Sequence, residues 1–83
     1  MSFVVPMYES ERGWGSKIDG YTGPFDSLSS ATLYVENYNL KYNNETRTPD
    51  YYIMALEPVP NRGQTCDYRL QEDLLQTSMG FAK

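Results

Sequence analysis

The chain has no histidine and only one cysteine, Cys66, among its 83 residues. Histidine is the commonest general base and the commonest metal ligand, so its absence excludes Ser-His and Cys-His catalytic pairs and the usual zinc sites. A single cysteine excludes a disulfide within the chain, which suits a reducing compartment. We therefore expect a protein that is not an enzyme and that holds no metal or cofactor.

Long apolar runs are also missing. The first residues, MSFVVPMYESER, have no basic segment, and Pro6 interrupts their short apolar stretch, unlike a secretory signal. No segment approaches the roughly 18 apolar residues of a membrane span. The sequence therefore predicts a cytoplasmic protein with no membrane contact.

Positive charge is scarce and scattered. Seven Lys and Arg residues stand singly against eleven Asp and Glu, which gives a net charge of −4. Nucleic-acid binding needs clustered basic residues, so direct binding of nucleic acid is disfavoured. The acidic residues are equally dispersed, which argues against a mimic of DNA.

Aromatic side chains are abundant, with eight Tyr, three Phe and one Trp. This content and the modest net charge indicate a folded chain rather than a disordered one. The length allows one domain with a thin core. We expect a single domain over 1–83, with its core at about 3–60 and a turn plus a second helix or flexible tail at 61–83. Because the core is thin, self-association into a homo-oligomer is a further hypothesis.

A first β-strand is predicted at 3–8, where Phe3, Val5 and Met7 share one face by the two-residue period. Pro6 has no N–H to donate to a neighbouring strand. The strand is therefore expected at the edge of the sheet or with a bulge.

Residues 9–15, which end in Gly-Trp-Gly, are interpreted as a hairpin loop longer than the tight two-residue type. A second strand is predicted at 16–22, and Gly23-Pro24-Phe25 is interpreted as the turn that ends it. Within this strand, Ile18 and Gly20 are expected to share the face opposite to Lys17, Asp19 and Tyr21.

A helix is predicted from Leu28 to about Tyr42, with Asp26 or Ser27 as its N-cap. Tyr34, Tyr38 and Tyr42 follow one another at intervals of four and form a row along it. Packing of the helix explains this row more simply than stacking of a ligand. The predicted apolar stripe consists of Leu28, Ala31, Val35, Tyr38 and Tyr42.

A third strand is predicted at 51–57, YYIMALE, which is apolar on both faces and so typical of an interior strand. Pro58 and Pro60 end it. The tail from 67 to 79 is interpreted as the second helix or as a loose end. Its apolar side would consist of Leu70, Leu74, Leu75 and Met79.

These elements predict an α+β fold, a small ββαβ(α) domain of two layers. One helix crosses a three-stranded sheet to bury its apolar stripe. If the third strand pairs beside the second, the two are parallel with a right-handed crossover; if it pairs beside the first, the sheet is wholly antiparallel. Pro6 favours the first arrangement.

The hairpin is the candidate protein-binding site. Trp, Tyr and Arg are the residue types most enriched in binding hot spots, and glycines permit sharp reversal of the chain. In the alternative interpretation, Trp14 folds back over Gly20 and fills the space that this glycine leaves. If the indole ring is half covered, it can both pack over Gly20 and contact a partner. The candidate site residues are Arg12, Trp14, Lys17, Asp19 and Tyr21.

The stretches ERGWGSKIDGYTGPFDSLSSA, YNLKYNN and PDYYIMALEPV resemble a group of small proteins encoded by tailed bacteriophages, over residues 9–60. The resemblance brings no assigned activity. It implies an accessory protein in the cytoplasm of a host bacterium that binds, and inhibits or modulates, a host enzyme or defence complex. One alternative is a protein that sequesters a nucleotide-like molecule, with tyrosines for stacking and Arg47 or Arg62 for charge. Another is a minor component of the virion.

Overall fold

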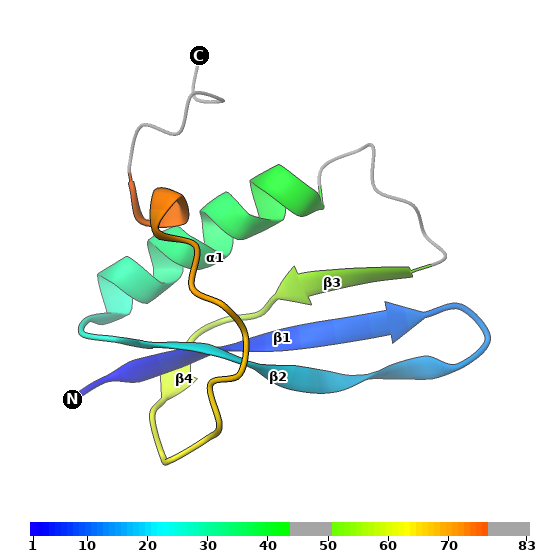
Figure 1. Ribbon diagram of the computed structural model, residues 1–83, viewed down its shortest axis with the longest axis horizontal. Helices are drawn as coiled ribbons and strands as arrows, with labels where there is room; N and C mark the ends of the chain where they lie inside the picture. The colour runs from blue at the N-terminus through cyan, green and yellow to red at the C-terminus, as the bar shows by residue number, and fades with distance from the viewer. Residues whose placement is uncertain (44–50, 77–83) are drawn as a thin grey trace.

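A computed structural model describes residues 1–43 and 51–76. It confirms the predicted α+β class: an antiparallel sheet lies under a single helix that crosses it (Figure 1). In chain order the elements are β1 (Phe3–Glu11), β2 (Gly15–Phe25), α1 (Leu28–Tyr42), β3 (Tyr51–Ala55), β4 (Val59–Pro60) and the 3-10 turn η1 (Glu72–Leu75).

Strand β1 is the centre of the sheet. The strand order is β2-β1-β3, and β4 pairs with the beginning of β1; every pairing is antiparallel. Of the two arrangements left open by the sequence, the wholly antiparallel sheet with the third strand beside the first is therefore confirmed, and the arrangement that Pro6 favours is wrong. The expected interior strand at 51–57 is wrong as well, because β3 lies at an edge of the sheet and Tyr51 is 45% exposed.

Pro6 is accommodated in this central strand at a gap between two partners. Its carbonyl accepts a hydrogen bond from the Leu56 N–H at 3.0 Å, on the β3 side of β1. In an antiparallel strand, an N–H at this position would point to the same side as the carbonyl. Strand β3 ends at Ala55 and β4 begins at Val59, so Pro6 lies opposite the break between these two partners of β1. The predicted edge position is wrong, and β1 itself carries no extra residue. The register does shift on both sides of Pro6, between Phe3 and Val5 and between Met7 and Tyr8, but at both places the extra residue belongs to β2.

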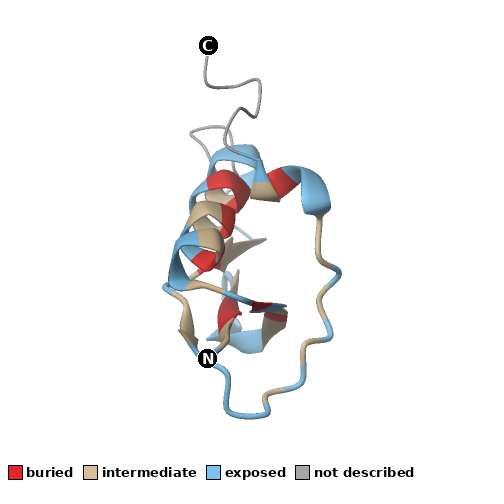
Figure 2. Cartoon of the chain, turned by 90° about the vertical axis from the view of Figure 1, so that its left-hand side faces the viewer, coloured by how far each residue is buried: buried red, intermediate tan, exposed pale blue. Residues whose placement is uncertain are grey.

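Helix α1 has the predicted bounds. The Ser27 side chain caps it by accepting a hydrogen bond from the Ser30 N–H at 3.1 Å. Its buried residues lie along the side that faces the sheet (Figure 2), where the Tyr34 and Phe25 ring centroids are 5.2 Å apart. The buried core consists of Val5, Met7, Phe25, Ala31, Tyr34, Tyr38, Ala55 and Leu74.

The predicted helix at 67–79 is wrong over the residues that the structure describes. Only Glu72–Leu75 is helical, as a single 3-10 turn, and Met79 lies outside the described residues. The buried Asn37 explains the difference, because its Nδ2 donates to the carbonyls of Leu74 at 2.7 Å and Gln76 at 3.1 Å. These two carbonyls therefore accept hydrogen bonds from a side chain of α1 instead of from backbone N–H groups of a helix at 67–79.

Residues 61–71 form a strap that passes from β4 around the outer edge of β2 to α1 (Figure 1). The Tyr68 N–H donates to the Tyr21 carbonyl at 3.1 Å. A Cβ added to Gly20 would lie 3.0 Å from two ring carbons of Tyr68, so this position needs glycine for close approach. A ring does fill the space above Gly20, but it belongs to Tyr68.

The outer edge of β3 is closed by the side chains of two asparagines, Asn39 of α1 and Asn43, the residue that caps the end of this helix. The Ala55 N–H donates to Asn39 Oδ1 at 2.9 Å, and Asn39 Nδ2 donates to the Ala55 carbonyl at 2.9 Å. Asn43 Nδ2 donates to the Ile53 carbonyl at 3.0 Å. These amides occupy the groups that another strand would use, so β3 is protected against strand addition.

Replacing Asn39 with alanine is expected to destabilise the fold and to open this edge. Two hydrogen bonds to the backbone of Ala55 are lost, together with the one from Asn43 Nδ2. At about 1 kcal/mol net each, with partial replacement by water, the free energy of unfolding falls by about 2 kcal/mol. Thermal melts and light scattering measure the loss and the increased aggregation.

Leu40→Ala is the control, because its side chain is 54% exposed on the next position of α1. We expect a change within about 0.5 kcal/mol for it. Equal melting temperatures for the two variants would mean that Asn39 does not hold β3.

Candidate functional site

The hairpin loop consists of residues 12–14, since β1 continues to Glu11 and β2 begins at Gly15. The loop is longer than two residues, as predicted. Both strands are longer than predicted. The turn predicted at 23–25 is wrong, because these residues belong to β2. The Trp14 N–H donates to the Glu11 carbonyl at 2.9 Å. Gly13 and Gly15 have φ of 86° and 91°, which other residues rarely adopt, so these glycines determine the shape of the loop.

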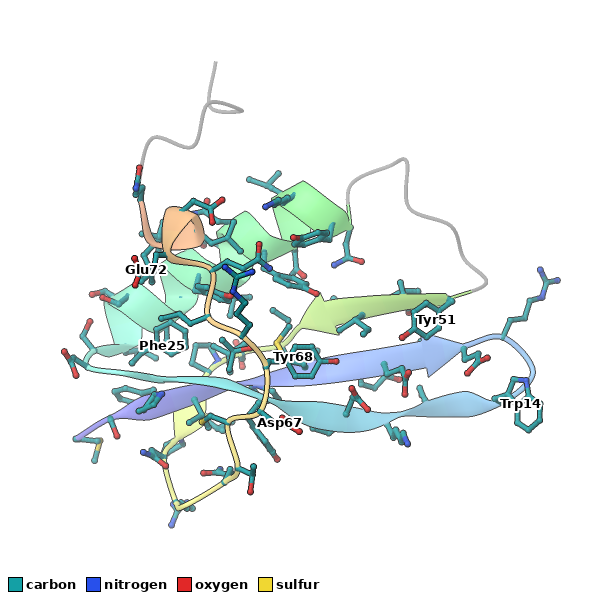
Figure 3. The ribbon with its side chains drawn as sticks, in the orientation of Figure 1. Trp14, Phe25, Tyr51, Asp67, Tyr68 and Glu72 are labelled. Atoms are coloured by element: carbon teal, nitrogen blue, oxygen red, sulfur yellow. The ribbon has the colours of Figure 1, made fainter. Side chains whose placement is uncertain are left out.

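Trp14 is displayed by this loop. Its side chain is 83% exposed and lies at the outer end of the hairpin (Figure 3). The alternative interpretation, in which it covers Gly20, is wrong because Tyr68 occupies that place. An open hollow of about 280 Å³ lies beside the indole, lined by Glu9, Glu11, Trp14, Gly15, Ser16 and Lys17.

A bulge in β2 changes the faces that were expected for its side chains. Ile18 pairs with Tyr8, but Gly20 pairs with Met7, so Asp19 is the extra residue between them. Because Tyr8 and Met7 point to opposite faces of β1, Ile18 and Gly20 do not share a face, and the prediction that they do is wrong.

The five candidate residues therefore do not form one cluster. Arg12 and Trp14 lie in the loop, and Lys17 pairs with Glu9 on the face that carries the helix. Tyr21 pairs with Pro6, beyond the bulge, and points to the opposite face. Asp19 and Tyr21 line a second open hollow, of about 370 Å³, with Ile18, Gly20, Gln64, Thr65 and Asp67.

The carboxylates of the hairpin accept hydrogen bonds from tyrosines of other segments. The Tyr68 hydroxyl donates to Asp19 Oδ2 at 2.7 Å, and the Tyr51 hydroxyl donates to Glu9 Oε2 at 3.0 Å. Burial and the bond to Asp19 raise the pKa of the Tyr68 phenol, while the bond to Glu9 raises the pKa of Tyr51. These contacts fix the position of the strap and of β3 on the hairpin.

The tyrosine row packs within the protein. The rings of Tyr34 and Tyr38 are buried, with centroids 6.4 Å apart, and Tyr42 follows at 4.7 Å from Tyr38. Two of the three rings thus have no open face for a stacked ligand. Arg62 is exposed in the strap, and Arg47 lies outside the described residues.

Comparison with known proteins adds no relative: no family model, no curated protein and no solved structure matches the chain. Over residues 1–43 and 51–76, no group of three or more Cys, Asp or Glu side chains is placed to hold a metal ion. In the same residues, no helix has both the length and the apolar character needed to cross a bilayer.

Proposed function

We propose that this chain is a protein-binding module that contacts its partner through the hairpin loop, with Trp14 as the central anchor. The observation that carries the proposal is the 83% exposure of the single tryptophan at the outer end of the hairpin. Tryptophan is the residue type most typical of binding hot spots, because it buries a large area and fixes only two side-chain torsions.

The loop is suited to binding because its shape is set before a partner arrives. The glycine conformations and the bond from Trp14 N–H to the Glu11 carbonyl define the turn, and the paired strands behind it anchor both ends. Little conformational entropy is then lost on association, which favours affinity. Trp14 also makes no contribution to the buried core, so the fold does not depend on it.

The class of partner rests on the resemblance to small phage proteins, which favours a protein of the bacterial host whose activity this chain inhibits or modulates. The charge of −4 and the scattered basic residues fit a protein partner better than a nucleic acid. A bacterial lysate is therefore the first source in which to seek it.

Trp14→Ala is expected to abolish capture of the partner from that lysate and to leave the fold unchanged. Loss of a central tryptophan typically costs 2 kcal/mol or more of binding free energy, which weakens binding about thirtyfold or more. The side chain is 83% exposed, so the free energy of unfolding should change by about 0.5 kcal/mol or less. Affinity capture with mass spectrometry and thermal melts measure the two effects.

Leu40→Ala is the matched control, since Leu40 is also a large exposed apolar residue but lies on α1. It should capture the partner as the parent chain does. Undiminished capture by Trp14→Ala would exclude the hairpin loop as the binding site.

A further inference from the structure

Two stretches of the outer backbone of the sheet are occupied by other parts of the chain. Asn39 and Asn43 cover the outer edge of β3, and the strap covers β2 at Tyr21. A further stretch, Ser16–Ile18 of β2, lies next to the hairpin loop. Within the described residues, no backbone group or side chain pairs with its outer side. We call this stretch the open edge.

The hydrogen bonds elsewhere in the sheet show which backbone groups point outward here. In an antiparallel strand, the N–H and C=O of one residue point to the same side, and the side alternates along the chain. Pro6 directs its carbonyl to Leu56 on the β3 side, so Tyr8 does the same. Ile18, which pairs with Tyr8, therefore directs both groups away from β1, and so does Ser16.

The strap agrees with this assignment on the other side of the bulge at Asp19. Tyr21 pairs with Pro6, and its carbonyl points outward, where it accepts the N–H of Tyr68. The open edge thus presents two donors and two acceptors in the pattern that an added antiparallel strand would pair with. It ends where the strap begins, so an added strand has a defined length and position.

We propose that the open edge binds an extended segment of the partner protein as an additional antiparallel strand, with basic side chains at the N-terminal end of that segment. This mode of binding rests on the proposed function, because Trp14 lies at the other end of the same edge and would cover the added strand. The main chain supplies the bonds along Ser16–Ile18, and the indole supplies apolar contact.

The basic end follows from the charges at the strap. An antiparallel segment has its N-terminal end beside the hollow of about 370 Å³ that Asp19 and Asp67 line. Both carboxylates are exposed, and neither forms an ion pair with a described Lys or Arg. Lysine or arginine at this end of the segment would therefore lie beside two exposed carboxylates.

A second copy of the chain fits the open edge poorly. An antiparallel pairing of two open edges that joins Ser16 of one copy to Ile18 of the other places Lys17 opposite Lys17. Like charges directly opposite one another destabilise a strand pair. The charge of −4 on each copy adds to the repulsion.

The test uses short synthetic peptides of alternating threonine and valine with two lysines at the N-terminal end. Backbone amide NMR of the whole chain should show that peptide binding shifts the signals of the Ser16 and Ile18 N–H groups and protects them from hydrogen exchange. The Lys17 N–H, which pairs with Glu9 on β1, should be protected both with and without the peptide. Methylation of alternate peptide amides should weaken binding about tenfold or more, because it removes hydrogen bonds worth about 1 kcal/mol each.

Ile18→Pro tests the edge from the side of the protein. It removes one outward N–H without removing a bond to β1, and its fold is checked by far-UV circular dichroism. It should weaken peptide binding about as much as amide methylation does, while Ile18→Thr, which keeps the N–H, should bind at near parental affinity. Asp67→Asn should weaken binding of the lysine peptide but should not weaken binding of a peptide that carries glutamates in place of the lysines.

Each other outcome overturns a stated part of the proposal. Equal binding of the methylated peptide, or no binding of any peptide, would refute strand addition, while loss of lysate capture by Trp14→Ala would still support the proposed function. If the glutamate peptide binds more tightly than the lysine peptide, the proposed basic N-terminal end of the segment is refuted. Sedimentation showing a dimer that Ile18→Pro dissociates would assign the open edge to a second copy.

Discussion

Tyr34→Ala is expected to lower the free energy of unfolding by about 3–5 kcal/mol, a large part of what a small domain has. Its side chain is 1% exposed and lies between the Phe25 ring and Tyr38. Its hydroxyl also accepts the N–H of Gln71 at 3.1 Å, which fastens the end of the strap to α1. The variant should therefore be largely unfolded at ordinary temperature, as circular dichroism and thermal melts would show.

Two further variants of the tyrosine row separate the causes. Tyr34→Phe keeps the ring and removes only the acceptor of Gln71 N–H, so it should lose about 1–2 kcal/mol. Tyr42→Ala removes a ring that is 43% exposed and should lose about 1 kcal/mol or less. Similar losses from Tyr34→Ala and Tyr42→Ala would contradict the packing role of the row.

The helix was predictable because its signals are local. Ser27 provides an oxygen for the first turn, and apolar residues recur at helical intervals from Leu28 to Tyr42, so the predicted and observed bounds agree. The same local pattern was misleading at 67–79, where leucines also recur. There the contacts of Asn37 with Leu74 and Gln76 hold the chain in another conformation.

The strand order was not predictable from the same kind of signal. Pro6 appeared to require an edge, but its missing N–H falls at the gap between β3 and β4, which depends on residues about fifty positions away. Likewise, the apolar sequence of 51–57 indicated an interior strand. The outer edge of this strand is instead covered by the side-chain amides of Asn39, in α1, and Asn43, at the end of α1. These two asparagines, four positions apart, are the sequence signal for that contact.

The candidate site was predicted in part. Gly13 and Gly15 correctly indicated a sharp loop that carries Trp14, and Gly20 correctly indicated close approach of a ring. The ring is that of Tyr68, from a segment with no periodic pattern, so the sequence could not identify it. The bulge at Asp19 also left no signal, and it separates Lys17 from Tyr21 on opposite faces.

The last prediction concerns alkaline pH. Burial raises the pKa of Tyr38 from 10.0 to about 12, and nearby tyrosines add to the effect. Burial likewise raises the pKa of Tyr34 and Tyr68. A folded-state pKa above the unfolded value means that the unfolded chain loses its proton first as the pH rises. The contribution of these tyrosines to stability should thus be fully present below about pH 10 and be lost between about pH 10 and 12.

For Tyr38 alone, a shift of two pKa units corresponds to a loss of about 2–3 kcal/mol by pH 12. Thermal melts across this range, followed together with tyrosinate absorbance, would measure it. Tyr38→Phe is the control, because no described residue hydrogen-bonds to this hydroxyl and the phenyl ring keeps the packing. The variant should match the parent below pH 10 and lose less stability above it. If both chains lose stability equally, the alkaline transition arises from the other tyrosines, and the burial of Tyr38 has no part in it.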